Sequence, residues 1–191
     1  MAKFIPRFTA ALERLASRSN LLYRGLSLYY KNLVKQEVTL AGIQPGDKVL
    51  CVGGGPSPFS AILIHEYTGA EVTIIDNENH SVDIAQELIK KLGYSEAIKV
   101  SYGDGRSFSP RGYTVIQLAV QISPMDKVFG HLLKNSKLGT RILMRVPRKS
   151  LTGFYDAADP SIFPCFQAEV VHRCRNIGST LLFVVGAEKQ A

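Results

Sequence analysis

The sequence predicts an α/β protein with a doubly wound, mostly parallel sheet, a C-terminal antiparallel hairpin and a short N-terminal helical cap. Three observations lead to this prediction. From Asp47 onward, short apolar runs alternate with helical patterns. The first run, residues 48–52, opens into three consecutive glycines followed by a helical pattern. The last two apolar runs are separated only by a turn, which is typical of a hairpin.

Two amphipathic helices are expected before the sheet. The second covers about residues 21–40 and ends before Gly42. We therefore expect a helical cap over residues 1–42 and a sheet domain over residues 43–191. The first helix is marked by apolar residues at three- and four-residue spacing: Phe4, Phe8, Leu12 and Leu15.

The sheet domain is expected to alternate strands with helices up to the final hairpin. Its strands are short apolar runs, and its helices place apolar residues on one side. The turn Asn176-Ile177-Gly178 is expected to join the last two strands. Strands are expected at 48–52, 71–75, 98–102, 113–120, 140–146, 168–175 and 180–185, and helices at 59–67, 81–92 and 124–135.

Composition indicates a soluble globular protein. The chain has 191 residues, of which 46% are hydrophobic and 20% charged, enough for a proper core. No apolar run reaches membrane-spanning length and no secretory signal is recognisable, so we expect a cytoplasmic protein without membrane contact. Three cysteines form no disulfide framework. Cys174 and His172 lack further ligands at a recognisable spacing, so no metal is expected.

Positive charge is concentrated near the N-terminus. The net charge is +7, and residues 1–36 hold seven Lys or Arg but a single acid, Glu13. A basic face can attract nucleic acid or an anionic surface. No nucleic-acid-binding motif accompanies the charge, so we interpret it as a solvated helix face and expect no nucleic-acid partner.

The glycine run Gly53-Gly54-Gly55, with Pro56, lies where open α/β sheets bind nucleotide-like cofactors. Its backbone can approach a ligand closely, and the next helix directs its N-terminus at that ligand. A nucleoside triphosphate loop would end in Gly-Lys-Ser/Thr, but Pro56-Ser57-Pro58 stands there. A dinucleotide loop would have its third glycine at Pro58. S-adenosylmethionine is therefore the leading candidate.

Two acids at the ends of consecutive strands support this cofactor. Asp76 follows Gly55 by 21 residues, and a carboxylate there can accept both ribose hydroxyls. Asp104 follows the next strand and can accept a hydrogen bond from the adenine amino group. Each acid alone equally fits a turn or cap residue, but their joint placement favours the cofactor. The other expected cofactor contacts are Asn77, Gly103, Gly105 and Ala119.

Residues 42–120 resemble a class I S-adenosylmethionine-dependent methyltransferase domain, which is Rossmann-like. Gly53-Gly54-Gly55-Pro56-x-Pro58 resembles the loop of nicotianamine synthase-like enzymes, and this similarity runs from about Lys31 through the hairpin. Ordinary methyltransferases carry an acidic residue before the glycines, where this chain has Cys51-Val52. The resemblance implies that S-adenosylmethionine is a co-substrate. Its 3-amino-3-carboxypropyl group would pass to an amine, with release of methylthioadenosine.

The resemblance also implies a glutamate just before the first strand as general base for the attacking amine. Glu37 matches that placement. Its spacing from apolar residues of the same helix independently puts it on or beside the apolar face, and burial raises the pKa of a carboxylate. An exposed glutamate near Lys31 is the alternative.

Three more side chains are candidates for the substrate site. Tyr30 and Tyr67 are expected either to orient the amine through their hydroxyls or to pack on amphipathic faces. Arg145, at the end of a strand, is expected to hold a substrate carboxylate by a two-pronged contact, or to be a surface cation.

Several functions remain open at this point. About forty residues precede the sheet, fewer than in nicotianamine synthases. The acceptor is therefore a small amine or amino acid, or a second subunit closes the site in a homodimer, or S-adenosylmethionine cyclises alone to azetidine carboxylate. The alternatives are a small-molecule methyltransferase on the same fold and a non-catalytic protein that binds nucleic acid or the cofactor.

Overall fold

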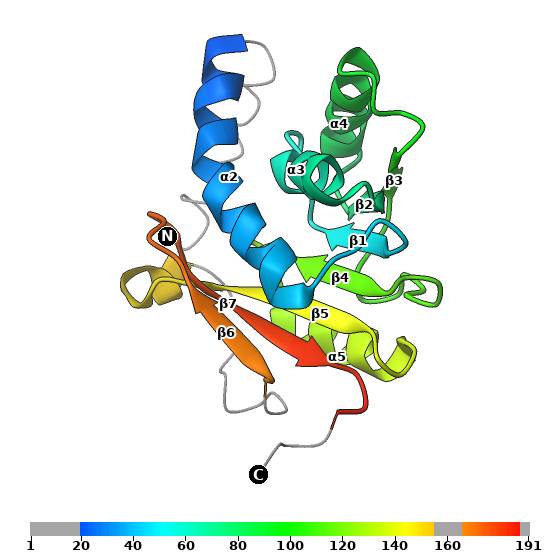
Figure 1. Ribbon diagram of the computed structural model, residues 1–191, viewed down its shortest axis with the longest axis vertical. Helices are drawn as coiled ribbons and strands as arrows, with labels where there is room; N and C mark the ends of the chain where they lie inside the picture. The colour runs from blue at the N-terminus through cyan, green and yellow to red at the C-terminus, as the bar shows by residue number, and fades with distance from the viewer. Residues whose placement is uncertain (1–19, 155–165, 188–191) are drawn as a thin grey trace.

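The computed structural model describes residues 20–154 and 166–187, and these contain the predicted doubly wound sheet (Figure 1). Seven strands form one sheet in the order β3-β2-β1-β4-β5-β7-β6. Strands β1 to β5 are parallel, whereas β7 runs antiparallel to both β5 and β6. The α/β class and the C-terminal antiparallel hairpin are thus confirmed.

Most elements lie within a few residues of their predicted bounds. The first predicted helix, with Phe4 and Leu15, lies outside the described residues, as does Cys165. The strands are β1 (Lys48–Val52), β2 (Glu71–Asp76), β3 (Ile98–Tyr102), β4 (Val115–Leu118), β5 (Arg141–Pro147), β6 (Ala168–Val171) and β7 (Ile177–Val184). The helices are α2 (Asn20–Ala41), α3 (Phe59–Thr68), α4 (Asn79–Lys91), α5 (Met125–Asn135) and the 3-10 helix η1 (Lys149–Phe154).

The hairpin turn differs from its prediction. Ile177 and Gly178 were expected in the turn but belong to β7, so the connection covers residues 172–176. The backbone N–H of His172 donates to the Gly178 carbonyl at 2.8 Å and continues the ladder. A Cβ on Gly178 would lie 3.2 Å from the Pro147 carbonyl oxygen. This glycine therefore serves a close approach between strands rather than a turn.

Helices cover both faces of the sheet. α2, α3 and α4 lie on one face and α5 on the other (Figure 1). Each face has its own core cluster, and the second brings Phe129 of α5 against Phe183 of β7 with ring centroids 4.7 Å apart. Because β1 to β5 are parallel, the loops after their carboxyl ends meet at one edge, where open α/β sheets bind ligands.

Helix α2 packs as part of the sheet's own core. Its Leu33 and Val34 are fully buried in the same cluster as Ile64 of α3 and Leu143 of β5. The division of the chain between residues 42 and 43 stays a prediction. No helix among the described residues is both long and apolar enough to cross a membrane.

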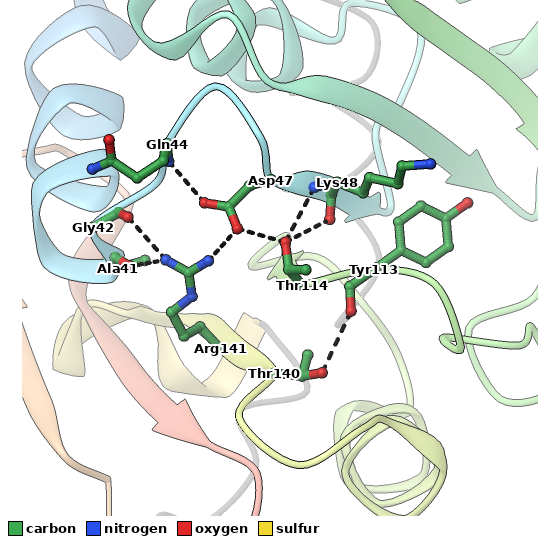
Figure 2. A network of polar contacts seen from close by, with 9 residues as sticks. All are labelled: Ala41, Gly42, Gln44, Asp47, Lys48, Tyr113, Thr114, Thr140 and Arg141. Carbon is green, nitrogen blue, oxygen red and sulfur yellow. Dashed lines mark hydrogen bonds and ion pairs between the residues drawn. The ribbon is translucent and has the colours of Figure 1, made fainter.

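A polar network anchors the junction between α2 and β1 (Figure 2). The Arg141 guanidinium donates to the carbonyls of Ala41 and Gly42 at 2.6 and 2.9 Å, and so satisfies the C-terminal end of α2. It also pairs with the carboxylate of Asp47. Since Arg141 begins β5, this contact ties the helix end to the middle of the sheet.

Asp47 is the centre of this network. Its carboxylate accepts bonds from the Thr114 hydroxyl at 2.6 Å and from the Gln44 backbone N–H at 2.7 Å, in addition to Arg141. Burial alone would raise the pKa of Asp47, but these bonds and the Arg141 charge outweigh it and lower the pKa. The ionised carboxylate therefore stabilises the fold.

We expect Asp47→Asn to lower the free energy of unfolding at pH 7 by about 1–3 kcal/mol, because it weakens bonds made to a charged, mostly buried group. The folded pKa lies below the unfolded value of about 3.9. The difference from wild type is thus complete above that pH and disappears as pH falls through the folded pKa. Urea unfolding at pH 7 and at pH 3 measures both. Asp83→Asn, on the exposed side of α4, is the control and should change stability by less than about 0.5 kcal/mol at either pH.

Candidate functional site

The glycine loop after β1 has a shape that only glycine allows. Gly53 and Gly55 have φ values of +74° and +62°, in the left-handed region. The backbone N–H of Gly53 donates to the Ile75 carbonyl at 2.9 Å, which holds the loop against the end of β2. A Cβ on Gly54 would lie 2.2 Å from Cγ2 of Ile74, so a side chain there must displace the core.

An outer cleft of about 260 Å³ opens beside this loop, at the carboxyl ends of β1, β2 and β3. Its lining brings together most of the residues expected to contact the cofactor: Gly53, Gly55, Pro56, Asp76, Asn77, Gly103, Asp104 and Gly105. The lining also includes Gln121 and Ser123, which sequence reasoning missed. Their position directly after β4 is the signal that could have found them.

Asp76 connects the end of β2 to the glycine loop. Its Oδ2 accepts the Gly55 backbone N–H at 2.8 Å, and its Oδ1 accepts the Glu78 backbone N–H at 3.0 Å. Burial raises the pKa of Asp76, and these backbone bonds offset only part of that rise. The carboxylate is thus fixed at the cleft wall, with each oxygen still having acceptor capacity.

Asp104 lies in the same cleft but is paired with Arg106. The Arg106 Nε is 2.9 Å from Oδ2 of Asp104, and its backbone N–H donates to Oδ1 at 2.9 Å. These bonds hold the pKa of Asp104 below its ordinary value. The expected bond to an adenine amino group would therefore have to share this carboxylate with Arg106, whose side chain is 53% exposed.

A smaller inner cavity of about 40 Å³ lies on the other side of the loop. It shares Gly53 and Gln121 with the outer cleft, so the two spaces adjoin. Gly54 and Ala119, which we expected to contact the cofactor, line this cavity instead of the cleft. For Gly54, the physical reason is that successive residues of the tight loop face opposite sides of it, whereas Ala119 directly follows β4. Further lining residues are Tyr30, Cys51, Ser60, Gln117 and Arg145.

Behind this cavity lies a buried ion pair between Glu37 and Arg145. The Arg145 Nε donates to Oε1 of Glu37 at 2.8 Å and its Nη2 to Oε2 at 2.6 Å. The exposed fractions are 0% for the Glu37 side chain and 5% for that of Arg145. Burial by itself would lower the pKa of Arg145, but Glu37 raises it, so the guanidinium stays charged. The two-pronged contact that we expected between Arg145 and a substrate carboxylate is made here with Glu37.

The ion pair continues into a chain of hydrogen bonds that no sequence pattern indicates. The Thr180 hydroxyl donates to Oε1 of Glu37 at 2.7 Å and lies 2.8 Å from Nε2 of His172. Nδ1 of His172 in turn lies 2.9 Å from Oε1 of Gln36. Burial lowers the pKa of His172, so the ring is neutral near pH 7. This chain joins α2 to the C-terminal hairpin.

The two candidate tyrosines lie in different places. The Tyr30 ring stacks on Phe59 with centroids 5.9 Å apart, has the Arg145 guanidinium 5.8 Å from its centre, and lines the inner cavity. Tyr67 is 41% exposed, and its hydroxyl donates to the Lys31 carbonyl at 3.4 Å. It lines neither space, because it occupies the last turn of α3, whereas only the first turn faces the loop. A role for Tyr67 in orienting the amine therefore has no support from the lining of either space.

The two described cysteines, Cys51 and Cys174, are free thiols. Cys51 is buried in β1, and burial raises the pKa of its thiol to about 12, so it stays protonated. Within residues 20–154 and 166–187, no group of three His, Cys, Asp or Glu side chains is placed to hold a metal ion.

Sequence comparisons give two kinds of curated relative, and no family model matches the chain. L-histidine 2-aminobutanoyltransferase from Yersinia pestis is 33% identical over 70 residues, which are 37% of this chain and 26% of that protein. Protein-L-isoaspartate O-methyltransferase from Thermococcus sibiricus is 29% identical over 122 residues, 64% of this chain and 54% of that protein. The chain thus spans about half or less of these relatives' lengths.

Structure comparisons give the fold. A glutamate-to-glutamine variant of the nicotianamine synthase MtNAS matches with a TM-score of 0.77 at 22% identity, over 93% of this chain and 70% of that one. MtNAS in complex with MTA and tNA matches with a TM-score of 0.76 at 21% identity, over 91% and 69%. An RNA methyltransferase from Salinibacter ruber, in complex with S-adenosyl-L-homocysteine, matches at 0.67 and 17% identity, over 84% and 95%. This chain therefore has the class I methyltransferase fold.

We expect Gly54→Ala to destabilise the protein by about 1–3 kcal/mol, because the new methyl group overpacks against Ile74. Thermal unfolding measures the loss. When Ile74→Ala is added, the double variant should lose less stability than the sum of the losses of the two single variants, since the clash is relieved. Gly130→Ala in α5 is the control, as nothing lies within 4 Å of the place that a Cβ would occupy there; a similar loss in this control would contradict the steric explanation.

We expect Glu37→Ala to lower the free energy of unfolding by about 3–5 kcal/mol, because it leaves Arg145 charged and buried without its carboxylate partner. The double variant Glu37→Leu/Arg145→Met should cost clearly less than the single one. Denaturant unfolding of the full cycle measures the coupling. Glu71→Ala removes a partner from the exposed Lys48–Glu71 pair and should change stability by less than about 1 kcal/mol. Equal costs for the single and double variants would show that the ion pair does not carry this stability.

Proposed function

We propose that this protein transfers the 3-amino-3-carboxypropyl group of S-adenosylmethionine to a small amine and releases methylthioadenosine. The observation that carries the proposal is the pair of adjoining spaces on either side of the glycine loop. The outer cleft has the carboxylate and backbone groups suited to a nucleoside, and the inner cavity has polar donors suited to an amino-acid end. The MtNAS likeness and the name of the Yersinia pestis relative support the same chemistry, because a 2-aminobutanoyl unit has the same four-carbon amino-acid skeleton as the 3-amino-3-carboxypropyl group.

In this proposal the outer cleft holds the adenosine part of the co-substrate. Asp76 accepts bonds from the ribose hydroxyls, and the residues Gly103 to Gly105 lie beside the adenine. The Asp104 carboxylate accepts a hydrogen bond from the adenine amino group while it keeps its bonds from Arg106. The cleft residues fit such a ligand, because a fixed carboxylate and exposed loop backbone lie at the carboxyl ends of neighbouring parallel strands.

The reaction itself is a displacement at carbon. The amine nitrogen forms a bond to the γ-carbon of the methionine part, the carbon–sulfur bond breaks, and its electron pair stays on sulfur as a neutral thioether. The protonated amine then loses a proton to a base. Attack at the γ-carbon or at the methyl carbon depends on which of them lies in line with the nitrogen, so positioning decides the product.

Glu37 remains our proposed proton acceptor. Its carboxylate lies directly behind Arg145 and Ser60, which line the inner cavity, and Arg145 Nη2 contacts both Ser60 and Glu37. A shift of the Arg145 side chain would free Oε2 of Glu37 to accept the proton of the amine.

Methyl transfer on the same fold is the second candidate. The isoaspartate methyltransferases from Thermococcus sibiricus and Aeropyrum pernix match longer stretches of this chain than the aminobutanoyltransferase does. This reaction would release S-adenosylhomocysteine and would need no carboxypropyl positioning in the inner cavity.

Product analysis distinguishes the candidates. The protein is incubated with S-adenosylmethionine alone, with L-histidine and with glycine, and the products are identified by mass spectrometry. We expect methylthioadenosine together with an adduct of one amine. Azetidine carboxylate in the absence of an amine would mean cyclisation, and S-adenosylhomocysteine would overturn the proposal.

Two controls make the result decisive. S-adenosylmethionine decomposes slowly by itself to methylthioadenosine, so a reaction without protein sets the background. Asp76→Ala removes the proposed ribose contact and should reduce the amount of product to that background. Asp83→Ala, at an exposed position of α4, should give as much product as wild type. Equal product from wild type and Asp76→Ala would contradict the proposed site.

A further inference from the structure

We infer that the inner cavity is a carboxylate-binding subsite in which Gln117 supplies hydrogen bonds that determine specificity. This inference deepens the proposed function and rests on it for the source of the carboxylate. The inner cavity, as defined above, lies between the glycine loop and the first turn of α3.

Gln117 is a buried polar residue whose surroundings do not satisfy its side chain. It lies in β4 between Cys51 of β1 and Leu143 of β5, in the middle of the sheet, and is 2% exposed. Its side-chain Nε2 is the one buried side-chain polar atom of the described residues that has no hydrogen-bond partner. Buried polar groups in folded proteins are almost always paired, so an unpaired donor on a residue that lines a cavity points to an acceptor that enters the cavity.

The surrounding groups favour an anion. Arg145 is the only charged residue among those described in the lining. Its charge is paired with Glu37, and its contacts with Glu37 and Ser60 use Nε and Nη2, which leaves the N–H groups of Nη1 as donors for a further acceptor. The Ser60 hydroxyl accepts one of these bonds and so has its proton to donate. Helix α3 begins at this cavity, and its N-terminus has no side-chain cap. A helix N-terminus favours negative charge.

The chemistry of the donors selects a carboxylate over an ammonium group. Gln117 Nε2, Ser60 and Arg145 all present hydrogens, and the Cys51 thiol in the same lining is uncharged. A neutral amide adds two directional donors without a second buried positive charge beside Arg145. A carboxylate has two oxygens that accept hydrogen bonds and no hydrogen to donate, which matches these donors.

Size limits what enters the cavity. A volume of about 40 Å³ admits a carboxylate head group but not a whole amino acid. The remainder of the ligand must lie in the outer cleft, which adjoins through Gly53 and Gln121. The carboxylate therefore belongs either to the carbon chain of S-adenosylmethionine or to an amino-acid acceptor.

The direct test follows the side-chain amide signals of Gln117 by nuclear magnetic resonance, assigned through their loss in Gln117→Met. Sodium acetate carries the carboxylate alone, and we expect it to shift these signals. S-adenosylmethionine should shift them at lower concentration if its own chain occupies the subsite, whereas methylthioadenosine, which lacks the carboxylate, should not. A shift on adding L-histidine to protein saturated with methylthioadenosine would assign the subsite to the acceptor. No shift with acetate, S-adenosylmethionine or L-histidine overturns the inference.

Binding measurements give a second, independent readout. Gln117→Met keeps the side-chain length and removes the donors. We expect it to lower the affinity for the carboxylate-bearing ligand by about tenfold, while the affinity for methylthioadenosine stays as in wild type. Gln86→Met, at an exposed position of α4, is the matched control, and its affinities for both ligands should stay within about twofold of wild type. If Gln117→Met lowers the affinity for methylthioadenosine by the same factor, Gln117 is structural and the inference is wrong. Amide shifts with acetate but no methylthioadenosine product would uphold the subsite and overturn the proposed function.

Discussion

The buried contact between Glu37 and Arg145 is the interaction on which the architecture of the site depends. It joins α2 to β5 across 108 residues of chain and, through Thr180, to β7. Removing two charges from water is costly, and this cost is repaid only while the pair and its hydrogen bonds stay together. The contact therefore fixes how α2 crosses the sheet and where the wall of the inner cavity lies. The Asp47 and Arg141 network holds the other end of the same helix in register.

A steric constraint complements this electrostatic one. The glycine loop turns tightly against Ile74 and Ile75 and so separates an outer cleft from an inner cavity. The outer cleft has fixed carboxylates and loop backbone, whereas the inner cavity has an arginine, a hydroxyl and an unpaired amide. This division allows one ligand to have its nucleoside and its amino-acid end recognised by different chemistry.

The same fold serves more than one reaction of S-adenosylmethionine, so fold likeness does not choose between them. MtNAS and the RNA methyltransferase both resemble this chain with TM-scores above 0.6. The distinction depends on which carbon of the sulfonium lies in line with the acceptor. In the function that we propose, that geometry follows from where the carboxypropyl end is held, so the proposal assigns the choice of reaction to the inner cavity rather than to the glycine loop.

The sequence by itself determined the sheet, the glycine loop and most of the cleft. Periodicity is local, and a parallel sheet brings the residues after each strand to one edge, so Asp76 and Asp104 could be placed together without coordinates. Only the tertiary structure decided that Arg145 faces Glu37, that Tyr67 lies away from both spaces, and that Gln117 is unpaired. These facts depend on contacts between distant residues. In a strand buried on both faces, such as β4, sequence alternation carries no information about which side a residue faces.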